Sequence, residues 1–410
     1  MKRARRKAAS DGAPPALRHK AGQQAGDSRY SDAARAAVQA TNARVREMHR
    51  AIAGKTFDAL ERLPFVGGPS SLVRAAHDAI AGGVYASIHH GSGGLLAATA
   101  AIERQLPGIG DEAAGSRLGS GLLSALNAGF GDYLAATGNA LAIPMALHLA
   151  GRPVPLDTEA LDAAYPSAGA RIALLIHGLA FDEHCWQPGK DAGVDIGRQL
   201  EEEFGHVPLY LRYNTGLPIA ENGAMLAVFL ESLLATWPQS VESMILIGHS
   251  MGGLIARNAC EQAAVDDLLW PQKTTMLVCL GSPHLGSPVE RLGQAVTTAL
   301  HSTEITAPLG RIAAARSQGV QDLRFGPGAN SRTPHEIAMR FIGSTLTDDV
   351  DHPLAEWLGD GLVTLGSATA HPVTGNIRSA RIGGLGHMAL PTDARVYKQI
   401  ASWLKEATPS

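Results

Sequence analysis

The feature that most constrains this chain is a glycine-rich hexapeptide, Gly248–Gly253, that joins an aliphatic run to a helical pattern. The run Met244–Ile247 predicts a buried strand that enters the hexapeptide, and Met251–Ala264 predicts the helix that leaves it. Glycines two positions before and two positions after Ser250 keep Cβ atoms out of the crowded strand–helix crossing, so the serine hydroxyl projects from a sharp turn. Such a turn predicts Ser250 as a nucleophile, and a glycine-rich turn with an incidental serine is the alternative.

Strand and helix patterns alternate through the second half of the chain, after the prolines at residues 153 and 155. This alternation is typical of an α/β fold with a mostly parallel sheet and crossover helices. We therefore expect an α/β domain over residues 165–410, with a lid-like insertion at about 288–334, where no strand is predicted. The other expected elements are strands Ile172–Ile176, Val207–Tyr213, Thr275–Leu280, Ile337–Gly343 and Ala380–Gly383, and helix Ile219–Trp237.

The N-terminal part differs in composition from the rest. Residues 1–50 hold 12 Lys and Arg against 4 Asp and Glu, and all five tryptophans lie after residue 165. We expect a disordered basic tail over residues 1–30 and an Ala/Gly-rich helical appendage over 31–150. Basic charge without interleaved aromatic residues is a poor signal for nucleic acid, so no such partner is expected. The helical region is expected to pack against the later domain, with peripheral contact to a membrane or lipid surface as the alternative.

The location of the protein is predicted from its start and its cysteines. No apolar stretch follows the basic first residues, so we expect no signal peptide. Three cysteines without paired spacing favour a reducing compartment. The stretch 129–149 is long enough to cross a bilayer, but it carries Asp132 and Asn139 and is rich in Ala and Gly. We therefore expect a cytoplasmic protein, with membrane association left open.

A second strand end lies upstream of the serine turn, at Leu175–Leu179. Gly178 lets the backbone of the next residue turn toward the serine, so the N–H groups of Leu179 and Met251 are the expected donors of an oxyanion hole. His177 also fits a metal ligand or a base, but at a strand end before glycine an orienting role is the better interpretation.

A nucleophilic serine needs a base, and the imidazole that serves it needs a carboxylate to select its tautomer. In a fold of this kind these partners follow the serine in the order acid, histidine. His387, between the last strand and the last helix, is the expected base, ahead of His371 and His352. Asp360, in a Gly-Asp-Gly-Leu-Val segment, is the expected acid. Three aspartates nearer to the preceding strand remain alternatives for the acid: Asp348, Asp349 and Asp351.

Taken together, these motifs resemble those of α/β-hydrolases in the lipase and esterase group. The matching segments are Ile-His-Gly-Leu, Gly-His-Ser-Met-Gly-Gly, Gly-Ser-Pro-His-Leu-Gly-Ser, Gly-Asp-Gly-Leu-Val and a closing Gly-His. The segment Arg212–Gly216 also looks like bacterial serine esterases that are grouped with the lipases and with the GPI inositol-deacylase-like family. The resemblance covers about residues 168–408, and nothing before residue 150 contributes to it.

The resemblance implies an α/β-hydrolase catalytic domain and a serine hydrolase that cleaves carboxylic esters through an acyl-enzyme. Thr364 departs from the pattern, because the family often has proline at this position after the acid. His284, in the loop Gly281–Pro288, is interpreted as a structural support of the serine turn. The residues carried over are Ser250, Asp360 and His387 as a catalytic triad, and Leu179 and Met251 as oxyanion donors.

Two other functions stay open beside the esterase or lipase. A transacylase or thioesterase would use the same triad, whereas a lipid- or membrane-binding protein would carry the domain without catalysis. No metal and no cofactor is expected, because the adjacent His89 and His90 would face different sides of a helix and the glycine-rich segments lack phosphate-binding spacing. The expected partner is a hydrophobic ester or lipid substrate.

Overall fold

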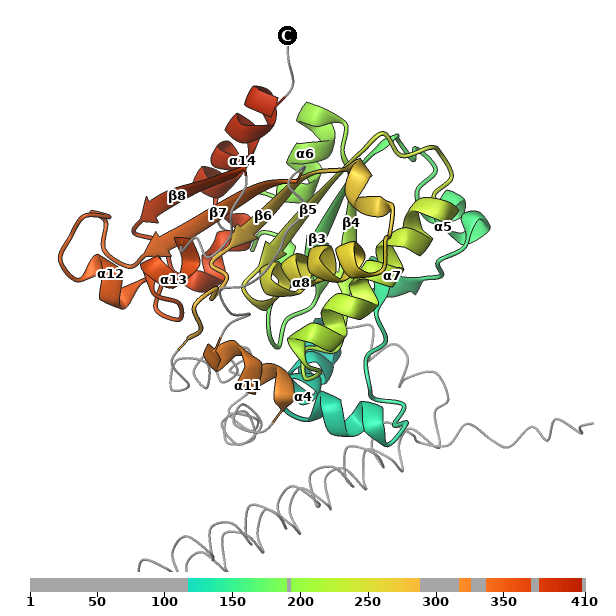
Figure 1. Ribbon diagram of the computed structural model, residues 1–410, viewed down its shortest axis with the longest axis horizontal. Helices are drawn as coiled ribbons and strands as arrows, with labels where there is room; N and C mark the ends of the chain where they lie inside the picture. The colour runs from blue at the N-terminus through green and yellow to red at the C-terminus, as the bar shows by residue number, and fades with distance from the viewer. Residues whose placement is uncertain (1–116, 190–192, 288–316, 326–336, 370–375, 408–410) are drawn as a thin grey trace, which may run out of the picture.

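The computed structural model describes residues 117–189, 193–287, 317–325, 337–369 and 376–407 (Figure 1). The predicted basic tail and most of the predicted helical appendage and lid insertion lie outside these residues. Within them, the chain forms an eight-stranded, mostly parallel sheet with helices on both faces. The predicted fold class is confirmed.

The strands are β1 Ala146–Leu149, β2 Arg152–Val154, β3 Arg171–Ile176, β4 Val207–Arg212, β5 Ser243–His249, β6 Thr274–Leu280, β7 Ala338–Thr345 and β8 Ile377–Gly383. They lie in the order β2-β1-β4-β3-β5-β6-β7-β8. All neighbours from β4 to β8 pair in parallel, whereas β1 is antiparallel to both β2 and β4. The connections run outward in opposite directions from β3, and ligands of open α/β sheets bind at the carboxyl ends of strands beside such a switch point.

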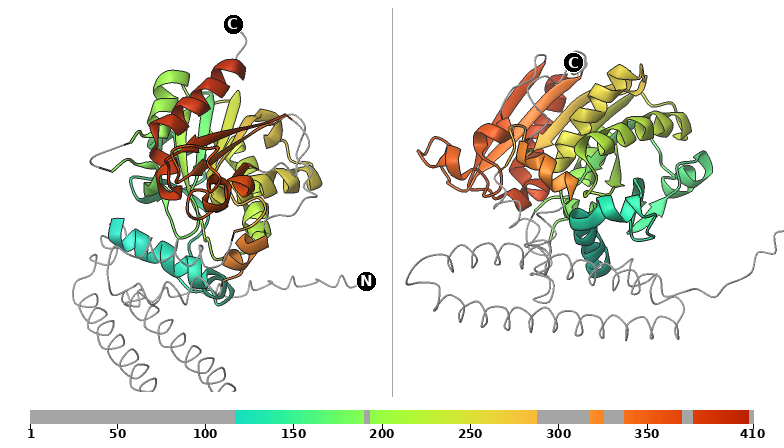
Figure 2. Two further views of the ribbon diagram at one scale, coloured as in Figure 1. Left: turned by 90° about the vertical axis from the view of Figure 1, so that its left-hand side faces the viewer. Right: turned by 60° about the horizontal axis from the view of Figure 1, so that its bottom comes forward.

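Helices cover both faces of this sheet, as Figure 1 and Figure 2 show. The described α-helices are α4 Arg117–Ala136, α5 Thr158–Ala164, α6 Ile196–Phe204, α7 Ile219–Thr236, α8 Met251–Val265, α11 Gln318–Phe325, α12 Ala355–Leu358, α13 Leu365–Thr369 and α14 Ala394–Ala407. Three short 3-10 helices are η1 Glu183–Trp186, η2 Trp270–Lys273 and η3 His387–Thr392. The hydrophobic core is therefore divided into two layers, with the sheet between them.

Strand β3 shows how the sequence builds these two layers. Ile172 and Ile176 pack with α7 and α8 on one face, while Leu175 packs with α6 and α14 on the other. All three side chains are 0% exposed. Successive side chains of a strand point to opposite faces, so a strand covered on both sides reads as a continuous aliphatic run.

The sheet begins earlier in the chain than residue 165, where the sequence places the start of the α/β domain. Strand β1 occupies the end of the stretch expected to be helical, and β2 follows directly after that stretch. Leu147 of β1 pairs with Leu211 of β4. The stretch 129–149 does not form one long helix, because it holds the end of α4, a connecting segment and β1. Strands of three and four residues carry no periodicity of their own, so the pairing with β4 decides their structure.

Helix α4 docks beside the carboxyl ends of the strands and lies next to α11 (Figure 1). The Asn127 side chain donates to the carbonyl of Leu141 at 2.8 Å and accepts from the amide of Ile143 at 3.0 Å, which ties the helix to the chain that follows it. Ser317, directly before α11, donates to the carbonyl of Ala128. Helix α11 and Ser317 are the described part of the predicted insertion.

Among the described residues, one helix is long and apolar enough to cross a membrane, namely α7. Its mean hydropathy over 18 residues is 1.3. Leu226, Leu230 and Leu233 of this helix are fully buried in the core layer that also contains α8. Of the same window, 39% is buried inside the structure.

Candidate active site

Ser250 stands on a strained turn between β5 and α8. Its backbone angles are φ 53° and ψ −119°, a region that costs a non-glycine residue about 1–3 kcal/mol. The surrounding backbone leaves no room for larger neighbours, since a Cβ on Gly248 would lie 2.3 Å from the Gly253 nitrogen. A Cβ on Gly252 would lie 2.4 Å from the Ile176 oxygen at the end of β3. The crowding that the sequence predicts for this turn is present on both sides of the serine.

Asp360 and His387 form a buried pair near this turn. Asp360 follows α12, and His387 begins η3 after β8. The His387 Nδ1 lies 2.7 Å from Asp360 Oδ2, and the side chains are 4% and 0% exposed. A carboxylate oxygen can only accept, so Nδ1 carries the proton and Nε2 is left as the acceptor. The other oxygen, Oδ1, accepts from the amides of Leu362 and Val363 at 3.0 and 2.8 Å.

Two further contacts bring this pair to the serine turn. The Nε2 of His249, the residue before Ser250, donates to the carbonyl oxygen of His387 at 3.1 Å. A Cβ on Gly281, after β6, would lie 3.0 Å from Asp360 Oδ2 and 3.1 Å from His387 Nδ1. These contacts place His387 against the residue before Ser250. No hydrogen bond joins Ser250 to His387 in the described parts of the chain.

The two expected oxyanion donors flank the serine. The loop after β3 runs against it, because a Cβ on Gly178 would lie 3.0 Å from the Ser250 Cβ. Leu179 follows directly and is 4% exposed. Met251 is the first residue of α8, where N–H groups have no acceptor within the helix. Both amides therefore belong to backbone that adjoins the serine.

His177 is enclosed rather than exposed to a substrate. Its ring stacks on that of Tyr213, with centroids 4.5 Å apart and planes at 17°. Its Nδ1 lies 2.9 Å from the carbonyl of Gly178, and the Tyr213 hydroxyl donates to the carbonyl of His177. Burial lowers the pKa of His177 to about 4, so the ring is neutral at pH 7. This setting fits the orienting role expected for it.

None of the described rival residues belongs to the buried pair. His352 is exposed, and its Nδ1 accepts from the amide of Leu354 at 3.1 Å. His371 lies outside the described residues. His284 contacts the Arg257 guanidinium at 2.7 Å and packs on Phe341, as a support of the loop after β6. The three alternative acids are exposed: Asp348, Asp349 and Asp351.

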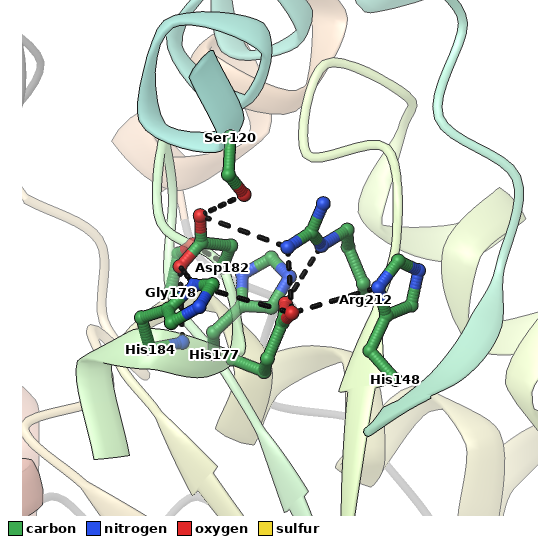
Figure 3. A network of polar contacts seen from close by, with 8 residues as sticks. Ser120, His148, His177, Gly178, Asp182, His184 and Arg212 are labelled. Atoms are coloured by element: carbon green, nitrogen blue, oxygen red, sulfur yellow. Dashed lines mark hydrogen bonds and ion pairs between the residues drawn. The ribbon is translucent and has the colours of Figure 1, made fainter. Parts of the chain in front are cut away.

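A second polar cluster, which the sequence reasoning missed, lies directly after the loop that carries Leu179 (Figure 3). Asp182, Glu183 and His184 present ligand atoms within 4.8 Å of one another, as a metal site would. The Arg212 guanidinium occupies this site, because its Nε and Nη2 donate to both oxygens of Glu183 at 2.7 and 2.6 Å. A fixed positive charge is thus paired with the Glu183 carboxylate. His89 and His90 lie outside the described residues. Two features of the sequence could have indicated this cluster, namely the adjacent Asp-Glu-His run and the motif that begins at Arg212.

Comparison with known proteins gives one partial family match. A model of the PGAP1-like alpha/beta domain matches residues 222–306, which span the serine turn. No curated protein matches the sequence.

Several solved structures are similar at low identity. The mature lipase BlEst2 of Bacillus licheniformis is 17% identical, over 58% of this chain and 92% of its own, with a TM-score of 0.41. The lin2722 product of Listeria innocua is 16% identical, over 58% and 95%, with a TM-score of 0.39. The RedJ thioesterase of the prodiginine pathway in Streptomyces coelicolor is 15% identical, over 59% and 92%, with a TM-score of 0.37.

The fold and the family match agree with each other. The sheet is mostly parallel, a strained serine turn joins β5 to α8, and an aspartate and a histidine follow it in that order. The PGAP1-like match covers the strand–turn–helix unit itself. These features are consistent with the α/β-hydrolase superfamily, and the family match covers the serine turn and its surroundings.

Proposed function

We propose that this protein is a serine hydrolase that cleaves carboxylic esters through an acyl-enzyme. The observation that carries the proposal is the strained Ser250 turn beside a buried Asp360–His387 pair, whose geometry leaves the outer nitrogen of the imidazole as an acceptor. A serine hydroxyl is a weak nucleophile by itself and needs a base of this kind. The PGAP1-like alpha/beta domain match spans the same serine turn.

In the proposed reaction, His387 Nε2 takes the proton of Ser250 Oγ as the oxygen attacks the ester carbonyl. The carbonyl oxygen becomes an oxyanion, which the N–H groups of Leu179 and Met251 bind. His387 then donates its proton to the leaving alcohol, and the acyl group stays on the serine. Water, deprotonated by the same imidazole, releases the acid and restores the enzyme. Asp360 holds the imidazole in the required tautomer throughout.

The proposed substrate is an ester with a hydrophobic group. Large apolar side chains are exposed near the Asp360–His387 pair. Met388 follows His387 directly, and the Leu346 side chain would lie 3.6 Å from a Cβ on Gly386, the residue before His387. Leu346 is 52% exposed and Leu285, in the loop after β6, is 59% exposed. Apolar surface of this kind would favour substrates with long acyl chains, so hydrolysis rates should rise with acyl length in a series of p-nitrophenyl esters. A transacylase or thioesterase would be identified in the same assay by products formed with added alcohols or thiols.

The proposal is tested by Ser250→Ala, measured by ester hydrolysis and by labelling with a fluorophosphonate probe. The variant should lose at least about 10⁴-fold in kcat, as expected when the nucleophile of a triad is removed, and it should not be labelled. The matched control is Ser243→Ala, at the opposite end of the same strand, where the hydroxyl contacts Thr275 at 3.3 Å. Hydrolysis at a near-wild-type rate by Ser250→Ala would refute the proposal, and a wild-type protein that is never labelled would favour a non-catalytic lipid-binding role.

A further inference from the structure

The loop after β3 carries the proposed oxyanion donor Leu179 and is called the oxyanion loop here. It contains an unfavourable backbone conformation of its own. Ala180, the residue after Leu179, has a φ of +63°, in the left-handed region that glycine ordinarily occupies. Its amide donates to Thr215 Oγ1 at 3.3 Å, and the amide of Phe181 donates to the carbonyl of Gly178 at 3.2 Å. A turn of this kind persists only where its surroundings hold it in place. The direction of the Leu179 N–H therefore depends on what anchors the loop.

One anchor comes from the sheet. Arg212 is the last residue of β4, and its fork of two N–H donors holds both oxygens of Glu183 at 2.7 and 2.6 Å (Figure 3). His148, on the neighbouring strand β1, lies 3.5 Å from the same carboxylate. Both partners of the ion pair are buried, where a bidentate pair restricts the geometry of the backbone that carries it.

A second anchor comes from α4, which lies before the sheet in the sequence. Ser120 donates its hydroxyl hydrogen to Asp182 Oδ2, and both residues are buried (Figure 3). The other oxygen of Asp182 accepts from the amide of His184 and contacts its ring, each at 3.0 Å, which closes the turn that begins η1. Asp182 is only three residues after Leu179. The helix thus contacts the loop directly behind the proposed oxyanion donor.

Helix α4 is itself held against the sheet on the side of β4. The Asn214 amide nitrogen donates to the carbonyl of Gly131 at 2.9 Å. A Cβ on Gly216 would lie 2.1 Å from the carbonyl oxygen of Asn127, so the helix and this loop are in close backbone contact. Both loop residues follow Arg212 within four positions. One rigid unit therefore joins α4, the end of β4 and the oxyanion loop.

We infer that Ser120 and Arg212 are positioning residues, which act through Asp182 and Glu183 to hold the Leu179 N–H toward Ser250. This inference rests on the proposed function, and it makes α4 a structural part of the active site. Neither residue touches the reacting atoms. Their effect is on the stabilisation of the oxyanion, which develops in the transition state and not in the bound ester.

The test compares Ser120→Ala with Ser124→Ala in the full chain. Ser124 lies one turn further along α4, is equally buried, and its hydroxyl has no partner among the described residues. Ser120→Ala should lower kcat about tenfold, a part of the 10²–10³-fold that one lost oxyanion donor costs, with KM within about twofold. It should weaken inhibition by phenylboronic acid, which forms a tetrahedral adduct with the serine, by the same factor. Ser124→Ala should change neither quantity, and Ser120→Thr, which keeps the hydroxyl, should restore both.

The outcomes separate the inference from the proposed function. If the wild type hydrolyses esters and Ser120→Ala matches it in kcat per labelled site, the positioning role is refuted even when the melting temperature falls. If the wild type neither hydrolyses esters nor reacts with a fluorophosphonate, the proposed function fails and the positioning role fails with it. Arg212→Lys is a second variant, which keeps the positive charge but cannot donate two parallel hydrogen bonds to the carboxylate. It should also lower kcat with little change in KM.

Discussion

At the residue scale, the serine turn is the part of the molecule that its own sequence predicts best. The glycines at 248 and 252 are required because backbone from β3 and from α8 approaches within 2.4 Å of where their Cβ atoms would be. A short motif between a strand and a helix is enough to predict that crowding. The left-handed φ of Ala180 could not be predicted in this way, because it depends on contacts with Thr215 and with the cluster after it.

The close approach at Gly252 leads to a stability prediction. Gly252→Ala places a methyl group 2.4 Å from the Ile176 oxygen, which is backbone and has little freedom to move. The free energy of unfolding should fall by about 3 kcal/mol, at the upper end of overpacking costs. The matched control is Gly121→Ala in α4, where nothing lies within 4 Å, and it should be neutral or stabilising by up to about 1 kcal/mol. Equal urea midpoints for the two variants would contradict the account of the turn.

At the element scale, the helices and strands that the sequence predicts are those with a long hydrophobic pattern or with clear turn and capping residues at their ends. The strand expected at 172–176 is β3 with one more residue, and the helix expected at 219–237 is α7 with one fewer. Helix α6 was not predicted, although Asp195 caps its start and Gly205 ends it in a left-handed conformation. A helix of nine residues shows only two turns of apolar periodicity, so the signals at its ends were insufficient without its packing partner α14.

The link between β4 and η1 makes stability depend on pH. Burial raises the pKa of Glu183, but its contacts with His148 and Arg212 outweigh burial and lower the pKa from 4.5 to about 2. A carboxyl whose folded pKa is depressed stabilises the fold above its unfolded pKa and loses that contribution as the pH falls toward the folded pKa. The free energy of unfolding should therefore fall between pH 4.5 and about 2.

Urea unfolding at a series of pH values measures this contribution. Glu183→Gln should lower the free energy of unfolding at pH 7 by about 3 kcal/mol, because Arg212 is left buried without its main partner, and it should flatten the acid slope. Glu202→Gln serves as the control, since Glu202 pairs with Arg198 on the surface of α6 and is 51% exposed. An acid slope that is the same in Glu183→Gln and in the wild type would disprove the assignment.

At the scale of the whole molecule, the α/β domain extends further toward the N-terminus than its motifs do. Every motif of the resemblance lies after residue 168, yet β1 covers the edge of β4 and α4 contacts the loop after β3. Phe130, Leu134 and Leu141 form a small core of their own between α4 and the following chain. Removal of these elements would expose apolar surface and an unpaired strand edge.

A pair of truncations tests this extent. A chain that begins at residue 151 lacks α4 and β1, so it should aggregate on size-exclusion chromatography and lose ester hydrolysis. A chain that begins at residue 117 keeps every described element and should retain both solubility and hydrolysis. A soluble, fully active chain from residue 151 would show that α4 and β1 are dispensable.

The sequence by itself determined the fold class, the central strands and the serine turn, because each depends on residues that are neighbours in the chain. It also indicated Asp360 and His387 through their places after the late strands, and the structure brings these two side chains within 2.7 Å of each other. Only the tertiary structure decided that β1 and β2 complete the sheet and that Ser120 and Arg212 contact Asp182 and Glu183 in the segment after β3. Contacts between segments 29 and 62 residues apart leave no periodicity in a sequence, since they form only when the sheet and its helices have assembled.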